Sequence, residues 1–133
     1  MADKKRSTKL PTSKAKNAYD LLTDIGKLAL EEPKRMRMGI WLVRGDDLWL
    51  FRDVVIPACG TIGCIGGWTY VLRPGPAVED TLGLTRAMEH QLFYNLALCN
   101  DIDQGTLAHS ERVVAHIKRF QKKYAKRLKA KAV

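Results

Sequence analysis

The chain has 133 residues, of which 46% are hydrophobic and three are tryptophans. This length and composition predict one globular domain with an ordinary hydrophobic core, and they exclude a disordered polymer. Three cysteines and no secretory signal argue against a disulfide framework and favour a reduced, cytoplasmic setting.

The net charge of +9 is concentrated at the two ends of the sequence. Residues 1–16 carry a net +5 and residues 117–133 a net +8, whereas residues 17–116 carry a net −4. Such cationic segments attract polyanions, either nucleic acid or an anionic membrane, although they can also serve only to keep a protein soluble. Residues 54–72 carry no charge, but Pro57 and four glycines favour a buried segment over a membrane span.

The first predicted elements are an arm and a helix. Residues 1–16 are rich in Lys, Ser and Thr, which predicts a flexible basic arm. A helix should begin after Asn17, whose side chain suits an N-cap, and end before Pro33. Its apolar residues recur at the spacing of an amphipathic helix: Ala18, Leu21, Leu22, Ile25, Leu28 and Ala29.

A β-hairpin is predicted over about residues 39–53. Gly45-Asp46 suits the centre of a type II′ turn, and this register places Leu42 opposite Trp49. Both faces would be apolar, and an isolated two-stranded hairpin is marginal in water. Helices should therefore cover this hairpin, or a third strand from residues 53–56 should join it.

The run CGTIGCIGGW, residues 59–68, predicts a central helix over about 62–72 that Thr61 caps and Arg73-Pro74 ends. Its three glycines would cluster on one side of this helix. Each glycine costs about 1 kcal/mol in a helix relative to alanine. We therefore expect neighbouring protein to pack closely against the bare side formed by Gly63, Gly66 and Gly67.

Two further helices are predicted in the C-terminal part. One is capped by Thr85 and extends to about Cys99, and the last begins at Thr106 or Ser110 and extends to about residue 128. Together the elements predict a mainly α (α+β) fold, a four-helix domain with one small hairpin. Its expected limits are residues 17–128, followed by a basic tail over 129–133.

Several kinds of chemistry could use the cysteines and glycines of the central motif. Cys59 is the one candidate nucleophile, because a helix N-terminus lowers the pKa of a thiol, yet no histidine is placed beside it. A zinc site would need Cys59, Cys64 and Cys99 with a histidine, and the usual paired signature is missing. A phosphate cradle over residues 60–63 matches neither common phosphate-binding pattern. We therefore predict no catalytic residue, no metal and no cofactor, and expect Cys64 and Cys99 to be buried, inert thiols.

The same motif resembles a signature of short uncharacterised proteins of bacteria and their phages, which reads Cys-Gly-Thr, two variable residues, Cys-Ile-Ala-Gly, then Trp or His. Met38 and Trp41 resemble the short lead-in of this family, and LGLTRAMEHQLF resembles its Leu-Gly-Leu helix. Two departures are Gly66, where alanine is usual, and a longer segment before Cys59. The resemblance implies no activity, but it implies a small, mainly helical domain whose central element contains Cys59, Gly60, Thr61, Cys64, Gly67 and Trp68.

Three functions remain open, and we favour a binding protein over an enzyme. The first is a small protein-interaction or regulatory module with an unknown protein partner. The second is a nucleic-acid-associated protein that uses its basic ends, and the third is a thiol enzyme or redox protein that uses Cys59. Membrane association is the least favoured role. The candidate nucleic-acid-binding residues on the last helix are Lys118, Arg119, Lys122, Lys123, Lys126 and Arg127.

Overall fold

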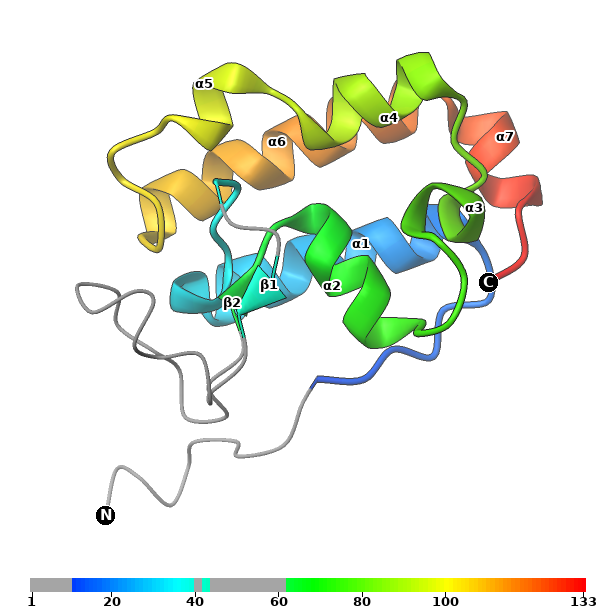
Figure 1. Ribbon diagram of the computed structural model, residues 1–133, viewed down its shortest axis with the longest axis horizontal. Helices are drawn as coiled ribbons and strands as arrows, with labels where there is room; N and C mark the ends of the chain where they lie inside the picture. The colour runs from blue at the N-terminus through cyan, green and yellow to red at the C-terminus, as the bar shows by residue number, and fades with distance from the viewer. Residues whose placement is uncertain (1–10, 40–41, 44–61) are drawn as a thin grey trace.

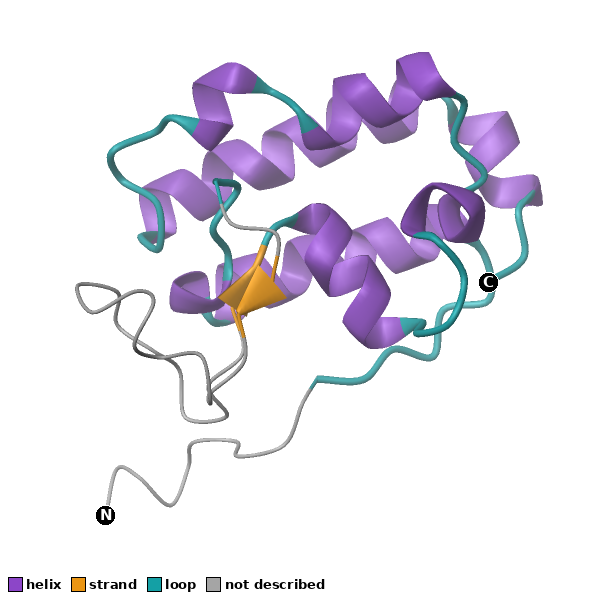
Figure 2. Ribbon diagram, in the orientation of Figure 1, coloured by secondary structure: helices purple, strands orange, loops and turns teal. Residues whose placement is uncertain are grey.

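The computed structural model describes residues 11–39, 42–43 and 62–133 (Figure 1). These residues form a mainly helical fold with one short pair of antiparallel strands (Figure 2). The strands are β1 (Leu42–Val43) and β2 (Ile62–Gly63). The helices are α1 (Ala18–Glu31), the 3₁₀ helix η2 (Pro33–Arg35), α2 (Ile65–Leu72), α3 (Val78–Leu82), α4 (Arg86–Phe93), α5 (Leu96–Cys99), α6 (Leu107–Lys123) and α7 (Ala125–Ala130).

Helix α1 confirms the prediction made from its cap and its apolar spacing. The side chain of Asn17 accepts a hydrogen bond of 2.8 Å from the backbone nitrogen of Asp20, and the helix ends just before Pro33. All six apolar residues of the predicted stripe are buried. This helix packs chiefly against α6. The two helices run antiparallel, since Tyr19 bonds to Gln121 and Gly26, further along α1, lies beside Val114, which comes earlier in α6.

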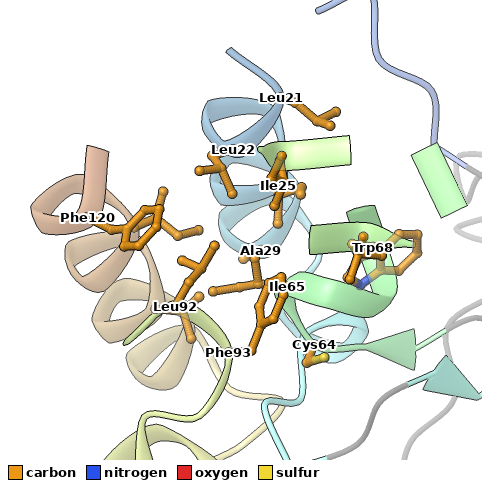
Figure 3. Packing of buried hydrophobic residues seen from close by; sticks show 14 of the residues in the cluster. Leu21, Leu22, Ile25, Ala29, Cys64, Ile65, Trp68, Leu92, Phe93 and Phe120 are labelled. Atoms are coloured by element: carbon orange, nitrogen blue, oxygen red, sulfur yellow. The ribbon is translucent and has the colours of Figure 1, made fainter. Parts of the chain in front are cut away.

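The hydrophobic core lies between two groups of helices. Figure 1 shows α4, α5 and α6 on one side of the molecule and α1 with α2 on the other. Figure 3 shows side chains of α1, α2, α4 and α6 that meet in this core. Fully burying a large apolar side chain contributes about 1.5–3 kcal/mol. The core residues include Leu22, Ile25, Ile65, Trp68 and Leu92, each with no exposed surface.

The predicted β-hairpin is not supported by the described residues. Its Gly45-Asp46 turn and its return strand lie outside them. The pairing that the structure does describe places Leu42 opposite Gly63 and Val43 opposite Ile62, so β1 joins a segment distant in sequence. The carbonyl of Gly63 also accepts a 3.0 Å hydrogen bond from the backbone nitrogen of Arg37.

This pairing also explains why the central helix begins later than predicted. Ile62 and Gly63 are held extended by β1, so α2 begins at Ile65 and not near residue 62. The N-cap is Cys64, whose sulfur lies 3.4 Å from the backbone nitrogen of Gly67. Thr61, which we expected to be the cap, lies outside the described residues.

The described residues contain more and shorter helices than the four predicted. The helix expected over 85–99 divides into α4 and α5, because Asn95 caps α5 by accepting a 3.1 Å hydrogen bond from the backbone nitrogen of Leu98. The last helix divides at Tyr124 into α6 and α7. The short helix α3 follows the Pro-rich turn and ends at Gly83, whose φ of 68° is in the left-handed region that favours glycine.

Candidate functional site

The two ends of the described chain meet beside α1. Ala132 pairs with Asn17 in an isolated antiparallel bridge, and the backbone nitrogen of Val133 donates a 3.0 Å hydrogen bond to the carbonyl of Lys16. The carbonyl of Lys131 accepts a 2.8 Å bond from the backbone nitrogen of Ala18. Figure 1 shows the C-terminus next to the chain that enters α1. Residues 129–133 were expected to form a tail. The structure instead places residues 129–130 in α7, and the backbone of residues 131–133 contacts residues 16–18.

A basic face covers the C-terminal half of α6 and α7. No acidic residue occurs between Ile117 and Val133. The buried side chains Ile117, Phe120 and Leu128 anchor these helices to the core and leave the charged positions outside. All six of the nucleic-acid-binding candidates are exposed, and we define the basic face by them: Lys118, Arg119, Lys122, Lys123, Lys126 and Arg127.

The basic face is not neutralised by acidic neighbours in the described part of the chain. There the ion pairs join Arg35 to Glu32 and Arg112 to two aspartates, and none involves the basic face. Among the residues that the structure describes, the positive charges of the basic face are therefore not compensated by an ion pair, which raises the local positive potential.

Two cations of the basic face hold the C-terminal helices in place. The Nε atom of Arg127 donates a 2.7 Å hydrogen bond to the carbonyl of Gly83, the residue that ends α3. Lys123 lies over the ring of Tyr124, with 5.4 Å between Nζ and the ring centroid, and the Tyr124 hydroxyl bonds to Gln91 of α4 at 2.8 Å. These contacts orient α7, while the other four cations extend into solvent.

The described part of the cysteine-glycine motif is buried. Cys64 is 6% exposed and caps α2, and burial raises the pKa of its thiol. Gly66 and Gly67 are buried, and the Trp68 ring donates a 2.8 Å hydrogen bond from Nε1 to the carbonyl of Arg35. This part of the motif therefore packs inside the protein. Cys59, Gly60 and Thr61 lie outside the described residues, and the proposal of a reactive Cys59 is untested.

Cys99 is also held away from reaction. Burial raises the pKa of its thiol, and its sulfur lies 3.7 Å from the carbonyl oxygen of Phe93. A thiol reacts mainly as its thiolate, so a raised pKa lowers its reactivity at neutral pH. Cys64 is buried as expected, whereas Cys99 is only half-buried. That both thiols are inert stays a prediction.

Two histidines of α6 bind carbonyl groups of α4 and α5. The Nε2 atom of His116 lies 3.1 Å from the carbonyl of Leu92, and Nε2 of His109 lies 3.2 Å from that of Leu98. A carbonyl only accepts, so each ring carries a hydrogen on Nε2 and donates it. Burial lowers the pKa of both rings, which keeps them neutral. The part of the chain that the structure describes contains no group of three or more His, Cys, Asp or Glu side chains arranged to hold a metal ion.

Sequence analysis did not identify Arg35 as a buried charged residue. Arg35 has no exposed surface, its Nε donates a 2.8 Å bond to Glu32, and its guanidinium lies 5.7 Å from the centroid of the Trp68 ring. Within the described part of the chain, its two terminal nitrogens have no hydrogen-bond partner. Arginine is normally exposed, so no local signal in the sequence distinguished this one from its charged neighbours.

Within the described ranges, no helix combines the length and the apolar character that crossing a membrane requires. Comparisons of the chain with models of known protein families, with curated proteins and with solved structures find no match.

Proposed function

We propose that this protein binds nucleic acid without sequence specificity, through the phosphate backbone and the basic face of α6 and α7. The observation that supports this most strongly is the backbone contact of Lys16 and Asn17 with Ala132 and Val133. This contact brings Lys16, an exposed cation just before α1, next to the last residues of the chain, which follow the basic helices α6 and α7. The charge of Lys16 thereby adds to the positive charge of the C-terminal residues.

The chemistry of the basic face suits phosphate and not a base edge. Lysine and arginine neutralise phosphates and release condensed counterions, which gives binding that is insensitive to sequence and sensitive to salt. Tyr124, which lies between Lys123 and Lys126 in the sequence, has its hydroxyl bonded to Gln91 and its ring against Phe120, at 4.9 Å between centroids. Its ring is thus used inside the protein and not as a platform for stacking bases.

Fluorescence anisotropy with a short labelled DNA duplex of random sequence tests this proposal. The logarithm of the binding constant should fall with the logarithm of the salt concentration by about 0.9 for each phosphate contacted. The double variant Lys122→Ala/Lys126→Ala should bind more weakly at every salt concentration. Its slope should be shallower by about 2, because two phosphate contacts are lost.

The matched control is the double variant Lys34→Ala/Arg86→Ala, which removes two exposed cations outside the basic face. This variant should bind within about twofold of the unaltered protein, since non-specific binding follows the local charge. The proposal fails if the unaltered protein does not bind DNA at low ionic strength. It also fails if the two double variants lose equal affinity.

A further inference from the structure

A partly apolar groove lies between α1 and α6. Lys118 is the residue that its lining shares with the basic face. Its volume is 280 Å³, and Gly26 of α1 forms part of its lining together with Leu30 and Val114. A side chain is missing at Gly26, where a Cβ would lie 3.5 Å from the Cγ2 atom of Val114. This distance is ordinary van der Waals contact, so Gly26 leaves room between two closely packed helices.

The walls of the groove are apolar and reach solvent. Leu30 is 40% exposed, and Val114 is half-buried on the opposite wall. The polar groups at one end are already satisfied, because Nε2 of Gln121 donates 2.8 Å hydrogen bonds to the Thr23 hydroxyl and the Tyr19 carbonyl. What remains available to a partner is therefore mainly apolar surface, of the kind that receives an amphipathic helix.

Lysines stand on both walls of the groove. Lys27 of α1 and Lys118 of α6 line it and are exposed, and neither forms an ion pair within the described residues. An occupant that carried positive charge would be repelled by both. This excludes the basic N-terminal residues of the same chain, which include Lys4, Lys5 and Arg6. A second copy of the chain would bring its own lysines against these two.

We propose that this groove docks an acidic amphipathic helix of a partner protein. The apolar stripe of that helix packs on Leu30 and Val114, and its carboxylates lie beside Lys27 and Lys118. Charge complementarity of this kind steers the encounter and fixes the orientation of the helix, while the apolar contact supplies affinity. The inference goes beyond the proposed nucleic-acid binding, because Leu30, Val114 and Lys27 are not part of the basic face.

The probe for the test is a synthetic helical peptide with leucines at spacings of three and four and glutamates on both flanks. Its matched partner has lysine in place of every glutamate. Isothermal titration should show that the acidic peptide binds the unaltered protein and that the lysine peptide does not. The groove variant Leu30→Ser/Val114→Ser should bind the acidic peptide at least about tenfold more weakly.

The control for lost apolar surface is Leu96→Ser/Ile102→Ser, which changes two apolar side chains that are 73% and 97% exposed outside the groove. It should bind the acidic peptide as the unaltered protein does. Lys27→Glu should weaken binding, and Lys34→Glu should not. The groove variant should keep its affinity for DNA, which shows that it is folded and separates a failure of the groove from a failure of the basic face.

Three results would overturn the inference. One is that the acidic peptide does not bind, and another is that it binds the groove variant as tightly as the unaltered protein, which would place it on the basic face. The third is sedimentation of the unaltered protein as a dimer that the groove variant loses, since the occupant would then be a second copy of this chain.

Discussion

The ring of His116 is joined to the carbonyl of Leu92 by a 3.1 Å hydrogen bond from Nε2, and this bond ties α6 to the last turn of α4. The amide of Asn95 lies 3.5 Å from the other ring nitrogen, Nδ1, which must accept. Both nitrogens are therefore used by the neutral ring. A proton added at Nδ1 of His116 would place its N–H against the N–H of the Asn95 amide, and two donors cannot form a hydrogen bond.

The pH dependence of stability follows from this arrangement and from the similar contact of His109. Desolvation by burial lowers the pKa of both histidines in the folded state. The unfolded chain then binds protons first as the pH falls below about 6.5, so the contribution of these two histidines to the free energy of unfolding should be constant near neutrality and decrease as the pH falls below about 6.5. Urea unfolding across this range measures the decrease.

The charges that face the two rings modify this effect without reversing it. Asp101 raises the pKa of His109, whereas Arg112 and Arg37 lower it, and Arg119 lowers the pKa of His116. The variant His116→Gln should show a smaller loss of stability on acidification, while His90→Gln, a change at an exposed ring, should show the same loss as the unaltered protein. A pH profile that His116→Gln leaves unaltered would contradict the assignment.

Trp68→Phe should lower the free energy of unfolding by about 2–4 kcal/mol, measured in urea. The ring of Trp68 has no exposed surface, and phenylalanine would leave a cavity and remove the 2.8 Å hydrogen bond to the Arg35 carbonyl. Tyr94→Phe is the control, because that side chain is 57% exposed and its replacement should change stability by less than about 0.5 kcal/mol. Equal stabilities of the two variants would be inconsistent with the packing described.

Arg35→Met should be neutral or stabilising in thermal unfolding, whereas Arg35→Ala should be clearly destabilising. The two terminal nitrogens of Arg35 are buried and have no hydrogen-bond partner among the described residues, so its removal recovers a desolvation cost. Methionine keeps most of the volume and the contact with Trp68, but alanine leaves a cavity. If both variants lose stability equally, the guanidinium makes a favourable interaction that its described contacts do not include.

Gly67→Leu should destabilise the fold by several kcal/mol through overpacking. Gly67 is a buried position of α2, and we expect a leucine side chain there to exceed the space of the packed interior. Ala87→Leu is the control, since Ala87 is an exposed position of α4. Differential scanning calorimetry should show a lower melting temperature for the first variant alone, and a Gly67→Leu protein that melts with its parent would refute the close packing.

Elements set by local chemistry were predictable from the sequence. The limits of α1 follow from Asn17 and Pro33, and its apolar spacing identified the face that packs on α6. The buried residues of α6 and the exposed cations beside them could also be predicted from the sequence, because helical periodicity alone places them on different faces. The mainly helical fold class was predicted for the same reason.

The remaining features depend on contacts between residues far apart in the sequence. The start of α2 at Ile65 is decided by the pairing of Gly63 with Leu42, and the burial of Arg35 by the position of Trp68. Sequence analysis located basic residues at both ends of the sequence, but only the tertiary structure showed that Asn17 pairs with Ala132 and that Lys16 bonds to Val133. A local pattern determines which residues turn inward along one helix. It does not determine which helices meet, because that depends on the free energy of packing the whole chain.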